Sequence, residues 1–266
     1  MNKILVAVFD SETKAFEGLA ALKDLHEKAD ITLYSSAVII KDANGAASVK
    51  QANDSGPIGS AVGALTGTLL GIIGGPIGMA VGASVGILGG LVYDSLDAGV
   101  NIDFLDEVSK VIAPGKCAVI AEIDEDWAAP VDTKLAVLSA DIFRRSRSEL
   151  IEDNLANESL ALSKEINDLK KEMKESNAKT KEAVKKTFDS VKDRLQANSA
   201  KIDAKIDQVS KETDAKIIAL QNQMKKAREG QAAKISNRIA EIKLQRDERT
   251  KKLLQAKVLI KEALKP

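Results

Sequence analysis

Hydrophobic and polar positions follow three patterns along the 266-residue chain. In residues 1–54 and 94–147, short apolar runs typical of strands alternate with stretches whose apolar residues recur every three or four positions, as in amphipathic helices. Residues 55–93 contain no charged residue. From residue 148 to 266, apolar residues recur at helical spacing in a background rich in Lys and Glu. These patterns predict a split head domain, a hydrophobic hairpin and a long helical tail.

The head pattern predicts an α+β domain. A helix is expected after Asp10, and His26 near its end has no sequence partner, which favours a structural role. The tetrapeptide DANG at 42–45 predicts a hairpin turn. The order β-α-β-β, insertion, α-β-α-β favours a ferredoxin-like sandwich of helices on a mainly antiparallel sheet. The expected strands are 3–9, 31–41, 46–51, 116–123 and 141–147, and the later helices are 102–112 and 131–139.

The uncharged segment has glycines at every fourth position in two arms. Because residues four apart lie on one face of a helix, each arm would present a glycine groove backed by Ile, Leu and Val. Gly74, Gly75 and Pro76 predict the turn between the arms. The predicted packing positions are Gly59, Gly63, Gly67 and Gly71 in the first arm and Gly78, Gly82, Gly86 and Gly90 in the second.

Two environments suit such a glycine-zipper hairpin. An arm of about 17 residues would span roughly 25 Å as a helix, slightly less than a hydrocarbon core of about 30 Å. One arm alone would insert only marginally, and packing of glycine faces between arms or subunits would add the missing stabilisation. The hairpin is expected to enter the cytoplasmic membrane, with head and tail on the cytoplasmic side. The alternative is a cytoplasmic assembly that buries the hairpin between its subunits.

The tail composition predicts long helices. After residue 148, proline occurs only at Pro266 and glycine only at Gly230, which is a candidate bend. The apolar stripe repeats every eleven residues, which is about 3.67 residues per helical turn. This period favours a nearly straight or slightly right-handed stripe. A coiled coil is the favoured interpretation, and a lipid surface is the alternative. The predicted seam consists of Val191, Leu195, Ile202, Ile206, Val209, Ile217, Leu220 and Met224.

Charge and composition narrow the possible functions. Residues 1–140 contain 9 Lys and Arg against 18 Asp and Glu, whereas the remainder contains 30 against 21. The acidic head and basic tail are therefore expected to attract each other, or the tail to meet an acidic surface. Aromatic residues make up 3% of the chain, with one His and one Cys. This composition disfavours nucleic-acid stacking, metal binding and cysteine chemistry, so no cofactor is expected.

No catalytic motif stands out. The sequence contains no P-loop, dinucleotide fingerprint or nucleophile elbow, and no catalytic residue or small-molecule substrate is identified. Glu122, Asp124, Glu125 and Asp126 form an acidic cluster that we interpret as a solvated strand end, with a hard-cation site as the alternative.

Four segments together carry a family resemblance: KILVAVFDSETKAFEGLAAL, AVIIKDANGAASVKQ, the glycine-rich segment and IAPGKCAVIAEID. Over roughly residues 1–147 the chain resembles a bacterial family of predicted membrane proteins, named domain of unknown function 1269. The resemblance implies a ferredoxin-like domain interrupted by a hydrophobic glycine-rich segment, and it carries over no catalytic residue. The long charged tail departs from the family pattern.

The expected function is that of a non-enzymatic, membrane-associated, oligomeric scaffold that self-associates through its tail. The alternative is a soluble oligomeric assembly or ligand-sensing module whose hairpin is buried between subunits.

Overall fold

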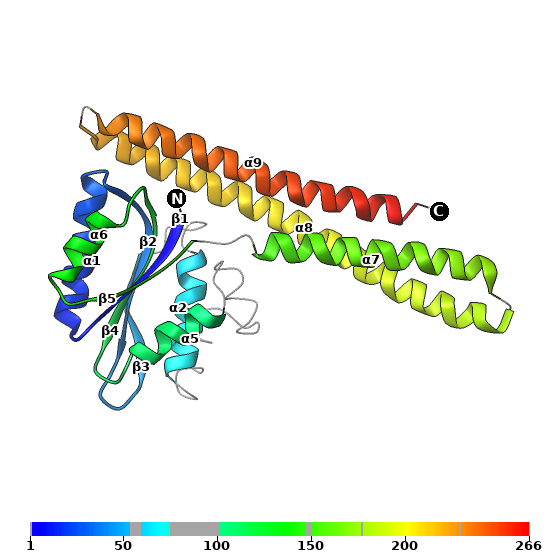
Figure 1. The fold of residues 1–266 in the computed structure, drawn as a ribbon, viewed down its shortest axis with the longest axis horizontal. Helices are drawn as coiled ribbons and strands as arrows, with labels where there is room; N and C mark the ends of the chain where they lie inside the picture. The colour runs from blue at the N-terminus through cyan, green and yellow to red at the C-terminus, as the bar shows by residue number, and fades with distance from the viewer. Residues whose placement is uncertain are drawn as a thin grey trace. The chain divides into compact units, whose positions relative to one another are not determined.

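A computed structural model describes residues 2–53, 60–74, 102–146, 150–176, 178–228 and 230–265 (Figure 1). The chain falls into two compact units. The head unit comprises Met1–Ser148 together with Asp214–Ala240, and the bundle unit comprises Glu149–Thr213 and Glu241–Pro266. A single tail starting at residue 148 was expected, but residues 214–240 of that tail lie in the head unit. We call this segment, Asp214–Ala240, the tip.

The head unit is an α+β domain with five antiparallel strands, as the sequence predicts. The sheet order is β3-β2-β4-β1-β5. Since β4 lies between β1 and β2, and β1 lies between β4 and β5, the segments β1-α1-β2 and β4-α6-β5 are two interlocked split βαβ units. The elements are β1 (Asn2–Phe9), α1 (Glu12–Glu27), β2 (Ile31–Lys41), β3 (Ala47–Asn53), α2 (Ser60–Ile73), α5 (Ile102–Val111), β4 (Cys117–Glu125), α6 (Ala129–Ala136) and β5 (Asp141–Ser146).

Local sequence signals fix the ends of these elements. Ser11 caps α1, because its hydroxyl accepts the backbone N–H of Lys14 at 3.3 Å. Between β2 and β3, the carboxylate of Asp42 accepts the N–H groups of Asn44 and Ala46. Gly45 completes this turn with φ +86°, a left-handed conformation that glycine adopts readily.

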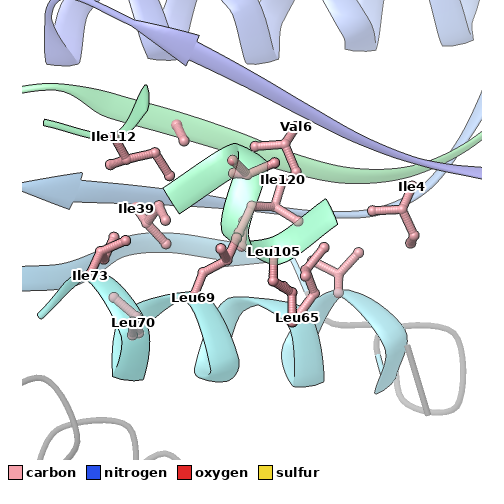
Figure 2. Close-up of a cluster of buried hydrophobic side chains, with 14 of the residues drawn as sticks. Ile4, Val6, Ile39, Leu65, Leu69, Leu70, Ile73, Leu105, Ile112 and Ile120 are labelled. Atoms are coloured by element: carbon pink, nitrogen blue, oxygen red, sulfur yellow. The ribbon is translucent and has the colours of Figure 1, made fainter. Parts of the chain in front are cut away.

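Helices cover both faces of the sheet (Figure 1). Alternate residues of each strand point to opposite faces. Leu5, Ala7 and Phe9 of β1 pack with α1 and α6, whereas Ile4, Val6 and Val8 pack with α2 and α5. Figure 2 shows the second cluster, in which Leu65, Leu69 and Ile73 of α2, Leu105 of α5 and Ile112 just after α5 meet Val6, Ile39 and Ile120 of the sheet.

Helix α2 is the first arm of the predicted glycine hairpin, and it belongs to the head core. Its contacts with the sheet use large apolar side chains: Leu65 and Leu69 are fully buried. Gly63 is exposed, Gly67 is half-buried and Gly71 is buried. Gly74 follows the helix. The other predicted hairpin positions, Gly59, Gly75, Pro76, Gly78, Gly82, Gly86 and Gly90, lie outside the described residues.

Gly63→Ala is expected to stabilise the head unit by about 0.5–1 kcal/mol, because alanine restricts the unfolded chain and favours helix. No heavy atom lies within 4 Å of a Cβ built at this exposed position. Thermal unfolding followed by circular dichroism measures the change. A destabilised variant would instead indicate that the bare backbone of Gly63 is needed for close packing against another helix.

The bundle unit contains long helices, as predicted for the tail. Helix α7 spans Leu150–Glu175, and the unit also includes the first part of α8 (Ala178–Lys226) and the last part of α9 (Gln231–Ala263). The side chain of Asn198 donates to the Leu155 carbonyl at 3.2 Å and to the Ser159 hydroxyl at 2.8 Å. The apolar core of the bundle unit consists of Leu155, Leu162, Ile166, Leu169, Val184, Val191, Leu195, Ile202, Leu253, Ala256, Ile260 and Ala263.

The predicted seam residues lie on the inner side of α8. The chain reverses between α8 and α9 at Gly230, whose φ is +91°, so this glycine marks the bend. The fully buried members of the seam are Val191, Leu195, Ile202, Val209 and Leu220, and the half-buried members are Ile206, Ile217 and Met224.

None of the described helices is both long enough and apolar enough to cross a membrane.

Candidate functional site

The sheet face that packs on α2 and α5 has an apolar half and a polar half. Along β4, Ala118 and Ile120 lie in the apolar cluster, and the same alternation continues with Glu122 and Asp124. Both acidic residues are buried, with exposures of 0% and 2%. Buried carboxylates require partners, because an isolated buried charge is strongly destabilising. The tip supplies several of the groups that contact this polar half.

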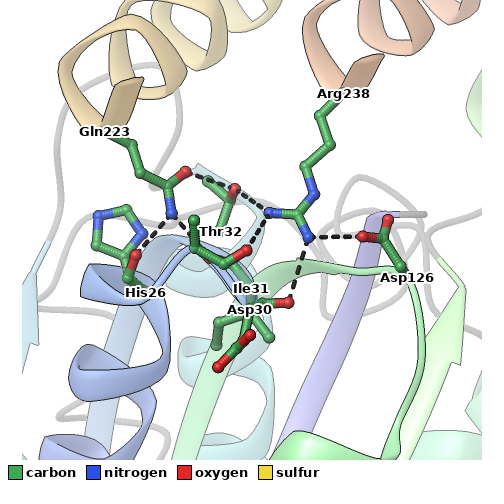
Figure 3. A network of polar contacts seen from close by, with 8 residues as sticks. His26, Asp30, Ile31, Thr32, Asp126, Gln223 and Arg238 are labelled. Atoms are coloured by element: carbon green, nitrogen blue, oxygen red, sulfur yellow. Dashed lines mark hydrogen bonds and ion pairs between the residues drawn. The ribbon is translucent and has the colours of Figure 1, made fainter. Parts of the chain in front are cut away.

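Arg238, at the start of α9, makes the most extensive contact with the polar half. Its side chain is 2% exposed. One terminal nitrogen donates to the Thr32 hydroxyl at 3.2 Å and to the Ala29 carbonyl at 3.4 Å. The other donates to the Asp30 carbonyl at 3.2 Å and to a carboxylate oxygen of Asp126 at 2.9 Å (Figure 3). One planar guanidinium thus joins the α1–β2 connection to the end of β4.

Gln223, near the end of α8, extends this network. The Thr32 hydroxyl, which accepts from Arg238, donates to the Gln223 side-chain oxygen at 2.8 Å. The Gln223 amide nitrogen donates to the carbonyls of His26 at 2.7 Å and Ile31 at 2.9 Å (Figure 3). These carbonyls belong to the last turn of α1 and the start of β2. Gln223 therefore satisfies backbone acceptors at two element ends.

Lys216 forms an ion pair with Glu122. Its ammonium lies 2.6 Å from the Glu122 carboxylate, and the two side chains are 5% and 0% exposed. The Asn2 side chain donates to the same carboxylate oxygen at 2.9 Å. The Lys216 ammonium also lies 5.2 Å from the centre of the Tyr34 ring, within cation–π range. We call the contacts of Lys216, Gln223 and Arg238 with the sheet the polar clamp.

The acidic cluster is mostly buried, so its interpretation as a solvated strand end is wrong for three of four residues. Glu122 and Asp124 are buried, and Glu122 pairs with Lys216 of the tip. Glu125, on the opposite face, is 1% exposed, and its carboxylate lies 3.0 Å from the Lys3 ammonium and 2.9 Å from Nε of Arg144. Only the Asp126 side chain is substantially exposed, at 48%. Cations from distant parts of the chain explain the burial of Glu122 and Glu125.

Burial and charge shift the pKa values of two residues beside the clamp. Burial, followed by the negative charges of Asp124 and Glu122, raises the pKa of Tyr34 well above its usual value. Burial lowers the pKa of His26, and the positive charges of Lys226 and Arg238 act in the same direction, while Glu27 opposes them. His26 Nδ1 accepts the N–H of Leu33 at 3.2 Å, so the proton of the neutral ring is on Nε2.

The lowered pKa of His26 predicts a pH dependence. The unfolded chain binds this proton more tightly than the folded one, so the stability from His26 is present above about pH 6.5 and decreases as pH falls toward the folded-state pKa. In denaturant unfolding between pH 8 and pH 5, His26→Gln should show a shallower loss of stability than the parent. Equal slopes for the two proteins would contradict this linkage.

No group of three or more His, Cys, Asp and Glu side chains within the described ranges is arranged to hold a metal ion. Cys117 is buried, and burial raises the pKa of its thiol. The clamp residues of the tip were missed in the sequence. The helical spacing could have indicated two of them. Lys216 lies four residues before the seam residue Leu220, and Gln223 lies three residues after it, so both are on the same side of α8 as Leu220.

Residues 60–161 match the model of a family described as a protein of unknown function (DUF1269). No curated protein and no solved structure matches the chain significantly. The matched segment begins and ends later than the expected 1–147, and it runs from α2 to the first half of α7. Over residues 60–161 the match therefore supports the family that the sequence resembles.

Proposed function

We propose that this protein is a non-enzymatic assembly protein in which a ferredoxin-like head holds the turn of a long helical tail, and the tail associates with a second copy. The two interlocked split βαβ units support the ferredoxin-like assignment, with β3 as an added edge strand. The observation that carries the proposal is the polar clamp, which buries Lys216 and Arg238 against the sheet.

The clamp has the character of a positioning device. Catalytic groups converge on a space that a substrate can occupy. Here the charged groups contact one another and the backbone: Arg238 binds two carbonyls, a hydroxyl and a carboxylate, and Lys216 binds Glu122. Such buried polar contacts specify one geometry at a cost in desolvation. A scaffold that must present its tail turn in one position benefits from that specificity.

An apolar face on α9 supports self-association of the tail. Leu254 and Val258 are 49% and 58% exposed, and they line an open groove of about 600 Å³ together with Asp247 and Lys251. An exposed apolar stripe on a helix is typical of a helix-packing surface. The opposite charges of Asp247 and Lys251 suit pairing with a second α9 in the antiparallel direction, because each charge then approaches its opposite.

The oligomeric state tests this proposal. At about 100 µM, most chains form dimers if the dissociation constant is in the low micromolar range, and sedimentation equilibrium measures the mass of the complex. The double variant Leu254→Gln, Val258→Gln should weaken association at least tenfold. Leu160→Gln is the matched control, because Leu160 is 57% exposed on α7. A monomeric parent, or equal association of all three proteins, would overturn the assembly function.

The sequence of residues 75–93 favours a membrane contact as a second candidate function. This segment has no charged residue, and its glycines at 78, 82, 86 and 90 keep helical spacing. We propose that it contacts lipid at the cytoplasmic membrane, with head and tail on the cytoplasmic side.

Because α2 packs on the sheet, the informative deletion removes residues 77–93 and keeps α2. The parent should remain in the membrane pellet after a carbonate wash and the deletion variant should not. Release of both would refute the lipid contact.

A further inference from the structure

A pocket of about 420 Å³ lies beside the polar clamp, within the head unit. One wall is the start of β2, with Leu33 and Tyr34, and the other is the end of α8, with Ala219 and Lys226. His26 from α1 completes the lining on one side. Its volume falls in the range of small-molecule sites, about 300–1,000 Å³.

The β2 wall is an open sheet edge whose polar groups are already paired. Strand β3 pairs with β2 only from Ser36 onward, so among the described residues Ile31 to Ser35 have no strand neighbour on that side. The N–H of Leu33 donates to His26 Nδ1, and the carbonyl of Ile31 accepts from Gln223. The edge is thus capped by side chains rather than by a further strand. Because Nδ1 of His26 is the acceptor in this contact, the Nε2–H is the hydrogen-bond donor of the neutral ring.

The lining combines an apolar part with a positive part. Leu33, Ala219 and the half-exposed Ile218 supply the apolar surface. Lys226 supplies an ammonium and Asn222 an amide, and the pocket lining contains no Asp or Glu. Ammonium, amide and imidazole N–H donors are the groups that bind a carboxylate in proteins. The pocket volume of about 420 Å³ is sufficient for a carboxylate with a short hydrocarbon chain.

We propose that this pocket binds a small amphipathic carboxylate, with its anionic group at His26, Asn222 and Lys226 and its hydrocarbon chain against Leu33 and Ala219. The site goes beyond the assembly function and does not depend on it.

Octanoate titration of the full chain tests the site. The chain has a single histidine, so the two-bond proton–nitrogen correlation spectrum of the imidazole reports on His26 alone. Octanoate should shift these signals in a saturable way with a Kd of about 1–10 mM, as expected for a ligand of this size. Acetate, which lacks the chain, and octanamide, which lacks the charge, should each bind at least fivefold more weakly.

Two variants separate the pocket from general charge effects. Lys226→Gln removes the ammonium of the lining and should weaken octanoate binding about fivefold. Lys234→Gln makes the same change of charge at an exposed position of the tip outside the lining and should leave the Kd unchanged. Both lysines are exposed, so neither variant endangers folding. A linear response without saturation, equal binding of acetate or octanamide, or equal effects of the two variants would overturn the proposal.

Discussion

Lys216→Met is expected to destabilise the head unit by about 3–5 kcal/mol, because it leaves the Glu122 carboxylate buried without its ammonium partner. The pair is separated by 2.6 Å, and the two side chains are 5% and 0% exposed. Asn2 still donates one hydrogen bond to Glu122, which is insufficient to stabilise a charge in a dry environment. Denaturant unfolding monitored by circular dichroism, together with hydrogen exchange of β4, measures the loss.

Two controls isolate burial as the cause. Lys110 and Asp106 form an ion pair with the same separation of 2.6 Å, but their side chains are 70% and 60% exposed. Lys110→Met removes this exposed pair and should leave the free energy of unfolding unchanged. The double variant Lys216→Met, Glu122→Leu removes both buried charges and should recover most of the lost stability. The buried ion pair would not be the source of the effect if the double variant were as unstable as Lys216→Met. The same would hold if Lys110→Met lowered the free energy of unfolding as much as Lys216→Met does.

Elements of the head could be predicted from the sequence because their signals are local. The strand Ile31–Lys41 was predicted with the bounds that the structure has, and the bend at Gly230 separates α8 from α9. Strand alternation, the Ser11 cap and the turn at Gly45 act within a few residues. The long tail helices follow in the same way from composition and spacing.

The partners of these elements could not be predicted, because periodicity identifies a face and not what covers it. The glycine spacing and apolar residues of α2 suit lipid, another subunit or a sheet equally well, and the structure places Leu65 and Leu69 on the sheet. Glu122 was interpreted as part of a solvated strand end, because its partner Lys216 is 94 residues further along the chain and cannot be identified from local sequence. The contact between Thr32 and Arg238 spans 206 residues.

The polar clamp explains why the tail seam changes character in the tip. Within the bundle unit the inner side of α8 is mostly apolar, as at Leu195 and Ile202. In the tip the same helical spacing presents Lys216 and Gln223 to the polar half of the sheet. A seam that continued as Leu or Ile would remove the ammonium partner of Glu122 and the amide that Gln223 donates to the carbonyls of His26 and Ile31. The mixture of residues therefore matches the two surfaces that α8 meets along its length.

Arg238→Met is expected to raise hydrogen exchange in the tip and at the start of β2 by about 30- to 1,000-fold, equivalent to about 2–4 kcal/mol of lost local stability. The variant keeps an unbranched apolar stem but leaves Thr32 and the carbonyls of Ala29 and Asp30 without the guanidinium. Arg238→Lys should recover only part of the protection, since one ammonium cannot reach all four acceptors.

The matched control is Arg228→Met in the exposed turn, for which exchange should change little. Peptides from 214–240 and from β2, followed by mass spectrometry, separate the two outcomes. If protection in the tip survived Arg238→Met, then the apolar contacts of Leu220 and Ile235, both fully buried, would be sufficient to hold it. If protection is lost there and retained in α1 and β5, the guanidinium is what fixes the turn of the tail to the sheet, because an apolar contact alone would not depend on the donors that Arg238 supplies.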